Sequence, residues 1–174
     1  MGLSVQLTFQ RKLLVFSIVL TTVVIFQSSC GKADLGRETG LQVPRFVSLS
    51  SNKVNVRAGP GRRYPIKWIF QRKNLPVKII AESDTWRKIK DHEGIEGWVH
   101  QRMLSGRRWA IILGETTLIR KDKKNAAPGV ARFEAGVIAS LEECVKEWCF
   151  IEASSYSGWV QSNKIWGVSS NEDD

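Results

Sequence analysis

The sequence predicts an all-β protein in which two small barrels follow one another after an N-terminal export segment. Three observations lead to this prediction. Residues 45–107 can be laid over residues 109–168 as two copies of one unit. Each copy consists of short runs of β-branched and aromatic residues separated by turn residues, and no segment keeps a helical period over three turns. The 174 residues are 43% hydrophobic and 25% charged, which excludes disordered and multi-spanning membrane proteins.

The first 30 residues are predicted to be a signal peptide or a membrane-anchor helix. Arg11 and Lys12 precede an uncharged run over residues 13–26, which is the layout of an export signal. The run is short for a membrane-spanning helix, so cleavage after export is the favoured interpretation and an uncleaved anchor is the alternative. Cys30 stands where a bacterial lipoprotein carries its lipidated cysteine, although Gln27 replaces the usual apolar residue. Cys30 is therefore either lipidated or an ordinary residue near the cleavage site, and we expect a periplasmic or secreted protein.

The other two cysteines, Cys144 and Cys149, are predicted to form a disulfide. An even number of cysteines suits an oxidising compartment. In a β-hairpin, their spacing can place them opposite each other at the base of the turn, close enough for a bridge. A metal site would need more ligands than this pair offers, so no metal is expected.

The two copies share the same landmarks in the same order. Lys53–Arg57 matches Thr116–Arg120, Trp86 matches Trp148, Ile89 matches Ile151, and Gly97-Trp98-Val99 matches Gly158-Trp159-Val160. The offset between the copies drifts only from 63 to 61, which small gaps in loops explain. Trp98 and Trp159 are interpreted as packing residues that close the ends of the barrels.

Each copy is expected to contain five or so strands. In the first copy they are predicted at residues 46–49, 53–57, 67–71, 77–82, 85–90 and 96–100, separated by Gly-, Pro-, Asn- and Asp-rich turns. Sixty residues with strands this short suit a small, strongly bent barrel, whose closure removes most free edges. Residues 31–44 are predicted to be a linker and residues 169–174 an acidic tail.

One segment of the first copy resembles a known family. Val54–Gly61, followed by Tyr64-Pro65, Trp86 and Gly97-Trp98-Val99, is similar to the bacterial SH3-like (SH3b) domain. This resemblance implies two SH3-like barrels in tandem, a fold whose members are recognition modules with varied ligands.

The second copy resembles the same family at its distal end. Trp148-Cys149 and Gly158-Trp159-Val160 are similar to the cysteine-bearing version found in exported proteins of Gram-negative bacteria. The copy departs from the pattern after Arg120, where Lys121–Asn125 replaces Ala-Gly-Pro-Gly. We therefore leave open whether the second copy binds a ligand.

The ligand site is predicted on the first copy, around its glycine-proline loop. Its candidate residues are basic or aromatic: Arg57, Arg62, Arg63, Tyr64, Trp68 and Trp86. Residues 45–108 contain 15 basic and 5 acidic residues, whereas residues 109–168 contain 7 of each, so an anionic ligand is expected. Export argues against nucleic acid and favours an anionic envelope polymer or an envelope protein. The alternatives are a solvated loop and, for Trp86, a packing role.

Catalysis has little support in the sequence. His92 and His100 lack a nucleophile at a recognisable spacing, and the adjacent Glu142 and Glu143 point to opposite faces of any strand. We therefore expect a non-catalytic exported binding module without a cofactor, with peptidoglycan or an envelope protein as its partner. The alternatives are a secreted factor that binds a host protein and a regulatory subunit of an envelope enzyme.

Overall fold

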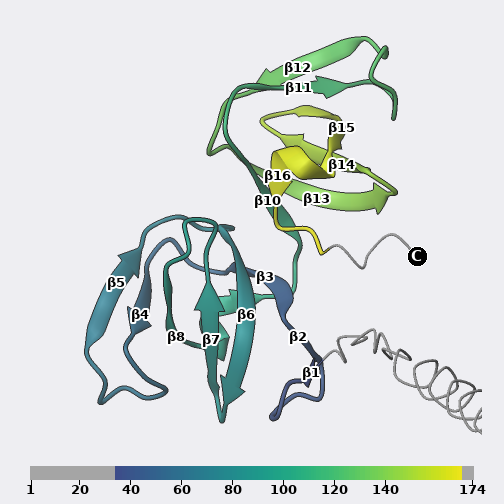
Figure 1. Ribbon diagram of the computed structural model, residues 1–174. Coiled ribbons are helices and arrows are strands. Elements are labelled where there is room, and N and C mark those ends of the chain that lie inside the picture. Colours follow the sequence, from purple (N-terminus) through teal and green to yellow (C-terminus); the bar gives the residue numbers. More distant parts are fainter. Residues whose placement is uncertain (1–33, 170–174) are drawn as a thin grey trace, which may run out of the picture. The chain divides into compact units, whose positions relative to one another are not determined.

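The computed structural model describes residues 34–169, which form two seven-stranded antiparallel sheets and a short hairpin ahead of them (Figure 1). The predicted signal or anchor, Cys30 and residues 170–174 lie outside this range. Within it, no helix is long and apolar enough to cross a membrane. Helical structure there is limited to the 3-10 turns Gln101–Met103 (η1) and Ser162–Lys164 (η2). The predicted all-β class with two tandem SH3-like barrels is confirmed.

The first barrel is one curled sheet with the strand order β5-β4-β8-β7-β6-β3-β9. Its strands are β3 (Arg45–Leu49), β4 (Val54–Arg57), β5 (Ile66–Phe70), β6 (Pro76–Ser83), β7 (Trp86–Lys90), β8 (Glu96–His100) and β9 (Leu104–Ser105). All pairs are antiparallel, and β5 lies at one end of the order. The strands expected from apolar alternation begin and end within about one residue of these bounds.

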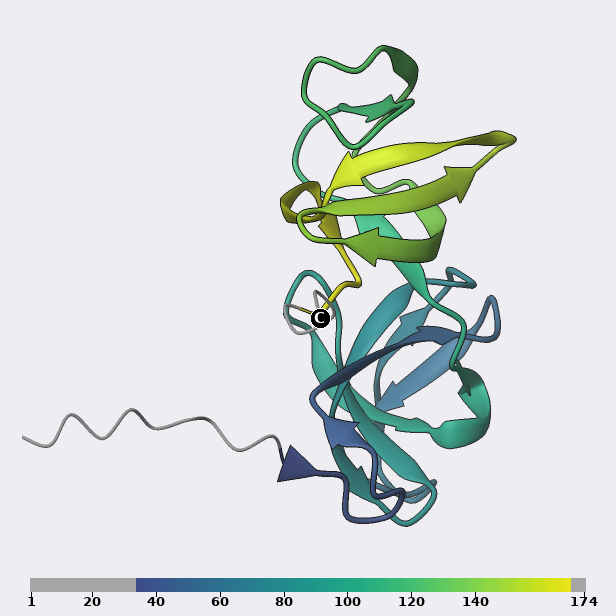
Figure 2. The ribbon, with the colours of Figure 1, turned by 90° about the vertical axis from the view of Figure 1, so that its right-hand side faces the viewer.

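The second barrel repeats this order as β12-β11-β15-β14-β13-β10-β16. Its strands are β10 (Trp109–Ile112), β11 (Thr117–Arg120), β12 (Gly129–Phe133), β13 (Ile138–Val145), β14 (Trp148–Ala153), β15 (Tyr156–Gln161) and β16 (Ile165–Trp166). The yellow-green arrows of β14 and β15 run side by side in Figure 2 and pair along their whole length. The repeat seen in the sequence is therefore also a repeat of strand register.

The glycine of each Gly-Trp-Val triplet is required by a close approach of two strands. A Cβ atom on Gly97 would lie 2.5 Å from Val56 Cγ1 and 2.9 Å from the carbonyl oxygen of Arg57. On Gly158 it would lie 2.6 Å from the carbonyl oxygen of Arg120. Because only glycine fits, β8 can cross β4, and β15 can cross β11, as each sheet bends back on itself.

Side chains alternate between the two faces of each strand, so that every second, mostly apolar, residue points into the core of its barrel. In the first barrel the fully buried side chains come from five strands and include Leu49, Val54, Val56, Val77, Ile79, Ile89 and Val99. In the second they include Ala110, Ile112, Ile119, Ala139, Cys149, Ile151 and Val160. Burial of this aliphatic surface is the main favourable contribution to folding of each barrel.

A hairpin precedes the first barrel where the sequence suggested a linker. Its strands β1 (Asp34–Leu35) and β2 (Gln42–Val43) pair antiparallel. The Glu82 carboxylate on β6 accepts hydrogen bonds from the backbone N–H of Glu38 at 3.1 Å, the backbone N–H of Thr39 at 3.0 Å and the Thr39 hydroxyl at 2.8 Å. The Glu82 side chain thus fastens the turn of the hairpin to the barrel, and we call this set of hydrogen bonds the Glu82 clasp.

The Glu82 side chain is fully buried and paired with two arginines. Its Oε1 lies 2.6 Å from Arg45 Nη2 and 3.4 Å from Arg87 Nε. Burial alone would raise the pKa of Glu82, but the hydrogen bonds from Arg45, Thr39 and Glu38 outweigh it and lower the pKa from 4.5 to about 2. The clasp is therefore charged at any physiological pH.

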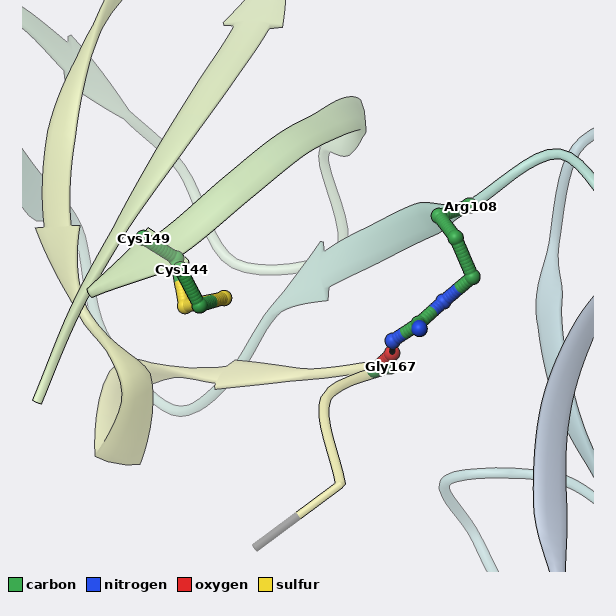
Figure 3. Close-up of a disulfide and its surroundings, with 4 residues drawn as sticks. All are labelled: Arg108, Cys144, Cys149 and Gly167. Carbon is green, nitrogen blue, oxygen red and sulfur yellow. Dashed lines mark hydrogen bonds between the residues drawn. A yellow bond between two sulfur atoms is a disulfide. The ribbon is translucent and has the colours of Figure 1, made fainter. Parts of the chain in front are cut away.

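The predicted disulfide joins Cys144 on β13 to Cys149 on β14, which are direct cross-strand partners (Figure 3). Their Cα atoms are 4.0 Å apart. Figure 3 also shows Arg108, whose Nη2 donates a hydrogen bond of 2.6 Å to the carbonyl oxygen of Gly167. The second barrel is therefore cross-linked by a disulfide at the β13–β14 hairpin. A hydrogen bond also joins the residue before β10 to the residue after β16.

Candidate binding site

The loop over residues 58–65 joins β4 to β5 and is held in shape by Arg57. The Arg57 Nη1 donates hydrogen bonds to the carbonyl oxygens of Arg62 at 3.1 Å and Tyr64 at 2.7 Å. The backbone N–H of Ala58 also donates to the carbonyl oxygen of Pro65 at 3.0 Å. Arg57 is predicted as a ligand contact; in the structure its guanidinium hydrogen-bonds to the loop and braces it.

Tyr64 packs flat on the glycines of this loop. A Cβ atom on Gly59 would lie 2.6 Å from the Tyr64 ring, so the ring can rest there only because residue 59 is glycine. The Arg63 guanidinium lies 5.2 Å from the centre of the same ring, and its Nη2 donates to the Tyr64 hydroxyl at 3.4 Å. This hydrogen bond raises the pKa of Arg63, which stays charged. Arg62 and Arg63 are both exposed, so the loop presents two arginines beside an aromatic ring.

The two tryptophans predicted as aromatic platforms differ in exposure. Trp68 on β5 is 51% exposed. Trp86 on β7 is only 9% exposed, and its ring meets that of His100 edge-on, with 5.4 Å between centroids. Trp68 is therefore available to a ligand, whereas the burial of Trp86 fits the packing alternative.

Trp98 is a further candidate for the site, which the sequence analysis did not propose. Its neighbours Gly97 and Val99 are buried, so the alternation of β8 places Trp98 on the outer face, where Arg57 and Lys88 are its cross-strand partners. It is partly exposed and is not the core-closing residue that we expected. The signal was present, because a buried valine next to a tryptophan in a strand sends the indole to the opposite face.

The corresponding tryptophan of the second barrel is covered. Lys123 Nζ lies 4.5 Å from the centre of the Trp159 ring, which packs edge-on against Phe150 and is 9% exposed. Among residues 34–169, the cations that lie over aromatic rings are over Tyr64, Phe46 and Trp159, and not over Trp98. The substituted loop after Arg120 therefore closes over the surface that the first barrel leaves open.

The second barrel has a pocket of its own, with a volume of about 420 Å³. Residues from β11, the start of β14, the end of β15 and η2 line it, among them Thr117, Trp148, Gln161 and Lys164. Gln161 is the partner of Trp148, as His100 is of Trp86. The His100 ring that packs on Trp86 in the first barrel is thus replaced by an amide, and the lining is both polar and apolar.

The structure brings several of the candidate residues together at the loop between β4 and β5. The loop brings Arg62, Arg63 and Tyr64 together, and Arg57 connects it to Trp98 through the cross-strand pair. Within residues 34–169 there is no cluster of three or more His, Cys, Asp or Glu side chains that could hold a metal ion. The arrangement can bind an anion by charge and by stacking.

Comparison with known proteins identifies both barrels. The model of the bacterial SH3 domain family matches residues 50–106 and residues 114–167. No curated protein is similar enough to this chain to count as a match.

Two solved structures from Trichomonas vaginalis are similar in part. NlpC2 is 12% identical with a TM-score of 0.33 over 71% of this chain and 48% of that one. NlpC1 is 12% identical with a TM-score of 0.34 over 75% of this chain and 48% of that one. The chain thus spans about half the length of each. Since the family match includes both barrels and more than half of the chain, the protein belongs to the bacterial SH3 domain family, with two copies in tandem.

Proposed function

We propose that this protein is an exported, non-catalytic binding protein of the cell envelope, whose first barrel holds an anionic polymer, with peptidoglycan as the ligand. Tandem SH3 domains of bacteria are recognition modules, and they account for both folded barrels. The observation that supports this function most directly is the braced loop of the first barrel. It holds exposed Arg62 and Arg63 beside Tyr64.

Charge supports the choice of ligand and of barrel. The excess of ten basic residues over residues 45–108 attracts anions, whereas residues 109–168 are neutral overall. In the second barrel two of the three lysines of the matching loop are engaged, since Lys123 lies over Trp159 and Lys124 pairs with Asp122 at 3.5 Å. The first barrel therefore supplies the anion contact, with Trp68 and Trp98 as aromatic surfaces for stacking.

The test is binding of the purified protein to isolated peptidoglycan sacculi at several salt concentrations. Reversing two charges in the loop (Arg62→Glu/Arg63→Glu) is expected to weaken binding about tenfold or more, and the wild-type affinity should fall with salt. The matched control is Lys121→Glu/Lys124→Glu, which changes the net charge equally in the corresponding loop of the second barrel. Equal losses in both variants, or none in the first, would contradict the proposal.

A second experiment tests where in the cell the protein is located. Mass determination of the mature N-terminus, together with cell fractionation, shows whether residues 1–30 are removed and whether Cys30 is lipidated. Recovery in the envelope fraction is expected. Recovery in the culture supernatant, without sacculus binding, would favour a secreted factor that binds a host protein, and co-purification with an envelope enzyme would favour a regulatory subunit.

A further inference from the structure

We propose that the free edge of β5 is a docking site for an extended acidic peptide segment, which joins the first barrel as an additional strand. This site uses the backbone edge and both faces of β5; the proposed polymer site is centred on the loop before β5 and shares Trp68 with it. The inference does not depend on the proposed function.

The edge is open and unusually apolar. β5 is the terminal strand of its sheet, with β4 as its recorded partner. Ile66, Trp68 and Ile69 are 44%, 51% and 45% exposed. Trp68 lies opposite the buried Val56, on the core side of the sheet, while Ile69 lies opposite the exposed Asn55 on the other face. An added strand would thus find apolar neighbours on both of its faces.

The second barrel shows that the fold does not require this apolar edge. In the same register, β12 carries Gly129 in place of Ile66, Ala131 in place of Trp68 and Arg132 in place of Ile69. Only the aromatic residue at the end of the strand is kept, as Phe133 and Phe70. The exposed side chains of the first barrel therefore need an explanation outside folding.

Charge around the edge defines the partner. Lys67 lies within β5, Arg62 and Arg63 precede it, and Arg72 and Lys73 follow it. No Asp or Glu occurs between residues 54 and 81. An acidic strand would be attracted, whereas a second copy of β5 would bring like charges together and be repelled.

The backbone argues against a lipid surface as the occupant. The free side of an edge strand presents N–H and C=O groups, which a peptide strand can pair but hydrocarbon cannot. In addition, Trp68 and Ile69 point to opposite faces of β5, so they do not form one insertable surface. Strand addition satisfies both the polar edge and the apolar side chains.

Hydrogen exchange on the full chain tests the proposal. The probes are a capped peptide of about eight residues, in which Glu alternates with Val, and the same peptide with Lys in place of Glu. We expect the acidic peptide to slow amide exchange in β5 and the basic peptide to leave it unchanged. Absence of β5 protection with the acidic peptide, or equal protection by both, would overturn the proposal.

A variant pair links the binding to the edge. In Trp68→Ala/Ile69→Gln, residue 68 becomes alanine, as at the corresponding position of β12, and residue 69 becomes a neutral polar residue. The variant should therefore fold, which circular dichroism checks. It is expected to bind the labelled acidic peptide about tenfold more weakly in fluorescence anisotropy. Val130→Gln, at the 43% exposed position of β12, should bind like wild type. Unchanged affinity in the double variant would overturn the proposal.

The other occupants and the proposed function are separated by parallel measurements. Binding of anionic phosphatidylglycerol vesicles that excludes the peptide, or a dimer that Trp68→Ala/Ile69→Gln dissociates, would replace the peptide as the partner and overturn the inference. Ile69→Gln alone should weaken binding of the acidic peptide and leave binding to sacculi intact, because Ile69 and Trp68 point to opposite faces of β5. Arg62→Glu/Arg63→Glu should weaken sacculus binding while β5 remains protected by saturating peptide.

Discussion

Replacing Glu82 with glutamine should destabilise the first barrel and loosen the hairpin ahead of it. The substitution keeps the shape of the side chain but removes the charge that pairs with Arg45 and Arg87. Lowering of the pKa of Glu82 from 4.5 to about 2 corresponds, at about 1.4 kcal/mol per pH unit, to about 3 kcal/mol of stability. Arg87 would retain its hydrogen bonds to Asp84, Trp86 and Gln101, so the loss should not be much larger.

The stability that Glu82 contributes should decrease as the pH falls. Because folding lowers the pKa of Glu82, its contribution is fully present above about pH 4.5 and is lost as the pH falls toward 2. Urea unfolding followed by tryptophan fluorescence should therefore show a difference of about 3 kcal/mol between wild type and Glu82→Gln at pH 7, shrinking toward zero near pH 2. Hydrogen exchange at Glu38 and Thr39 should become faster in the variant at pH 7.

A matched control separates the clasp from ordinary surface pairing. Glu96 also pairs with two cations, Lys88 at 2.9 Å and Lys90 at 3.6 Å, but on the exposed surface. Glu96→Gln should change stability far less than Glu82→Gln. A difference for Glu82→Gln that is as large at pH 2 as at pH 7, or as small as that of Glu96→Gln, would refute the reasoning.

Three further predictions concern the loop and the disulfide. Gly59→Ala should push the Tyr64 ring off its seat and weaken sacculus binding, with an unchanged circular dichroism spectrum; normal binding would contradict the packing described for Tyr64. Arg57→Met should lose two hydrogen bonds, at a cost of about 1–3 kcal/mol, and speed hydrogen exchange over residues 58–65; slow exchange there would show that the loop needs no brace. Cys144→Ser/Cys149→Ser closes no loop and should lower the free energy of unfolding of the second barrel by about 2 kcal/mol, measured in urea, while leaving sacculus binding intact.

Most of the fold could be predicted because its determinants are local. Alternation of apolar residues predicted the strands, and the repeated Gly-Trp-Val triplets helped to show that one unit occurs twice. The disulfide followed from the spacing of Cys144 and Cys149 on one hairpin. Each of these features depends on residues close together in the chain.

The features that escaped prediction depend on distant partners. The hairpin over residues 34–43 is fastened by Glu82, more than forty positions away from Glu38 and Thr39. The burial of Trp86 depends on His100, and the bracing role of Arg57 depends on the path of a loop whose carbonyl oxygens it meets. Residue type alone indicated an aromatic and basic candidate site, whereas the distinction between exposed side chains and those that support the loop required the coordinates.

The Glu82 clasp also determines how mechanical load would enter the barrel. A pull on residue 34 would be shared between the pairing of β1 with β2 and the hydrogen bonds from Glu38 and Thr39 to Glu82, because both lie between residue 34 and β3. Arg45 and Arg87 share the load with β3 and β7, so it would spread over three strands of the sheet. The first barrel would therefore resist a pulling force through the buried ion pairs of Glu82. Below about pH 4.5 less energy would be needed to open the clasp.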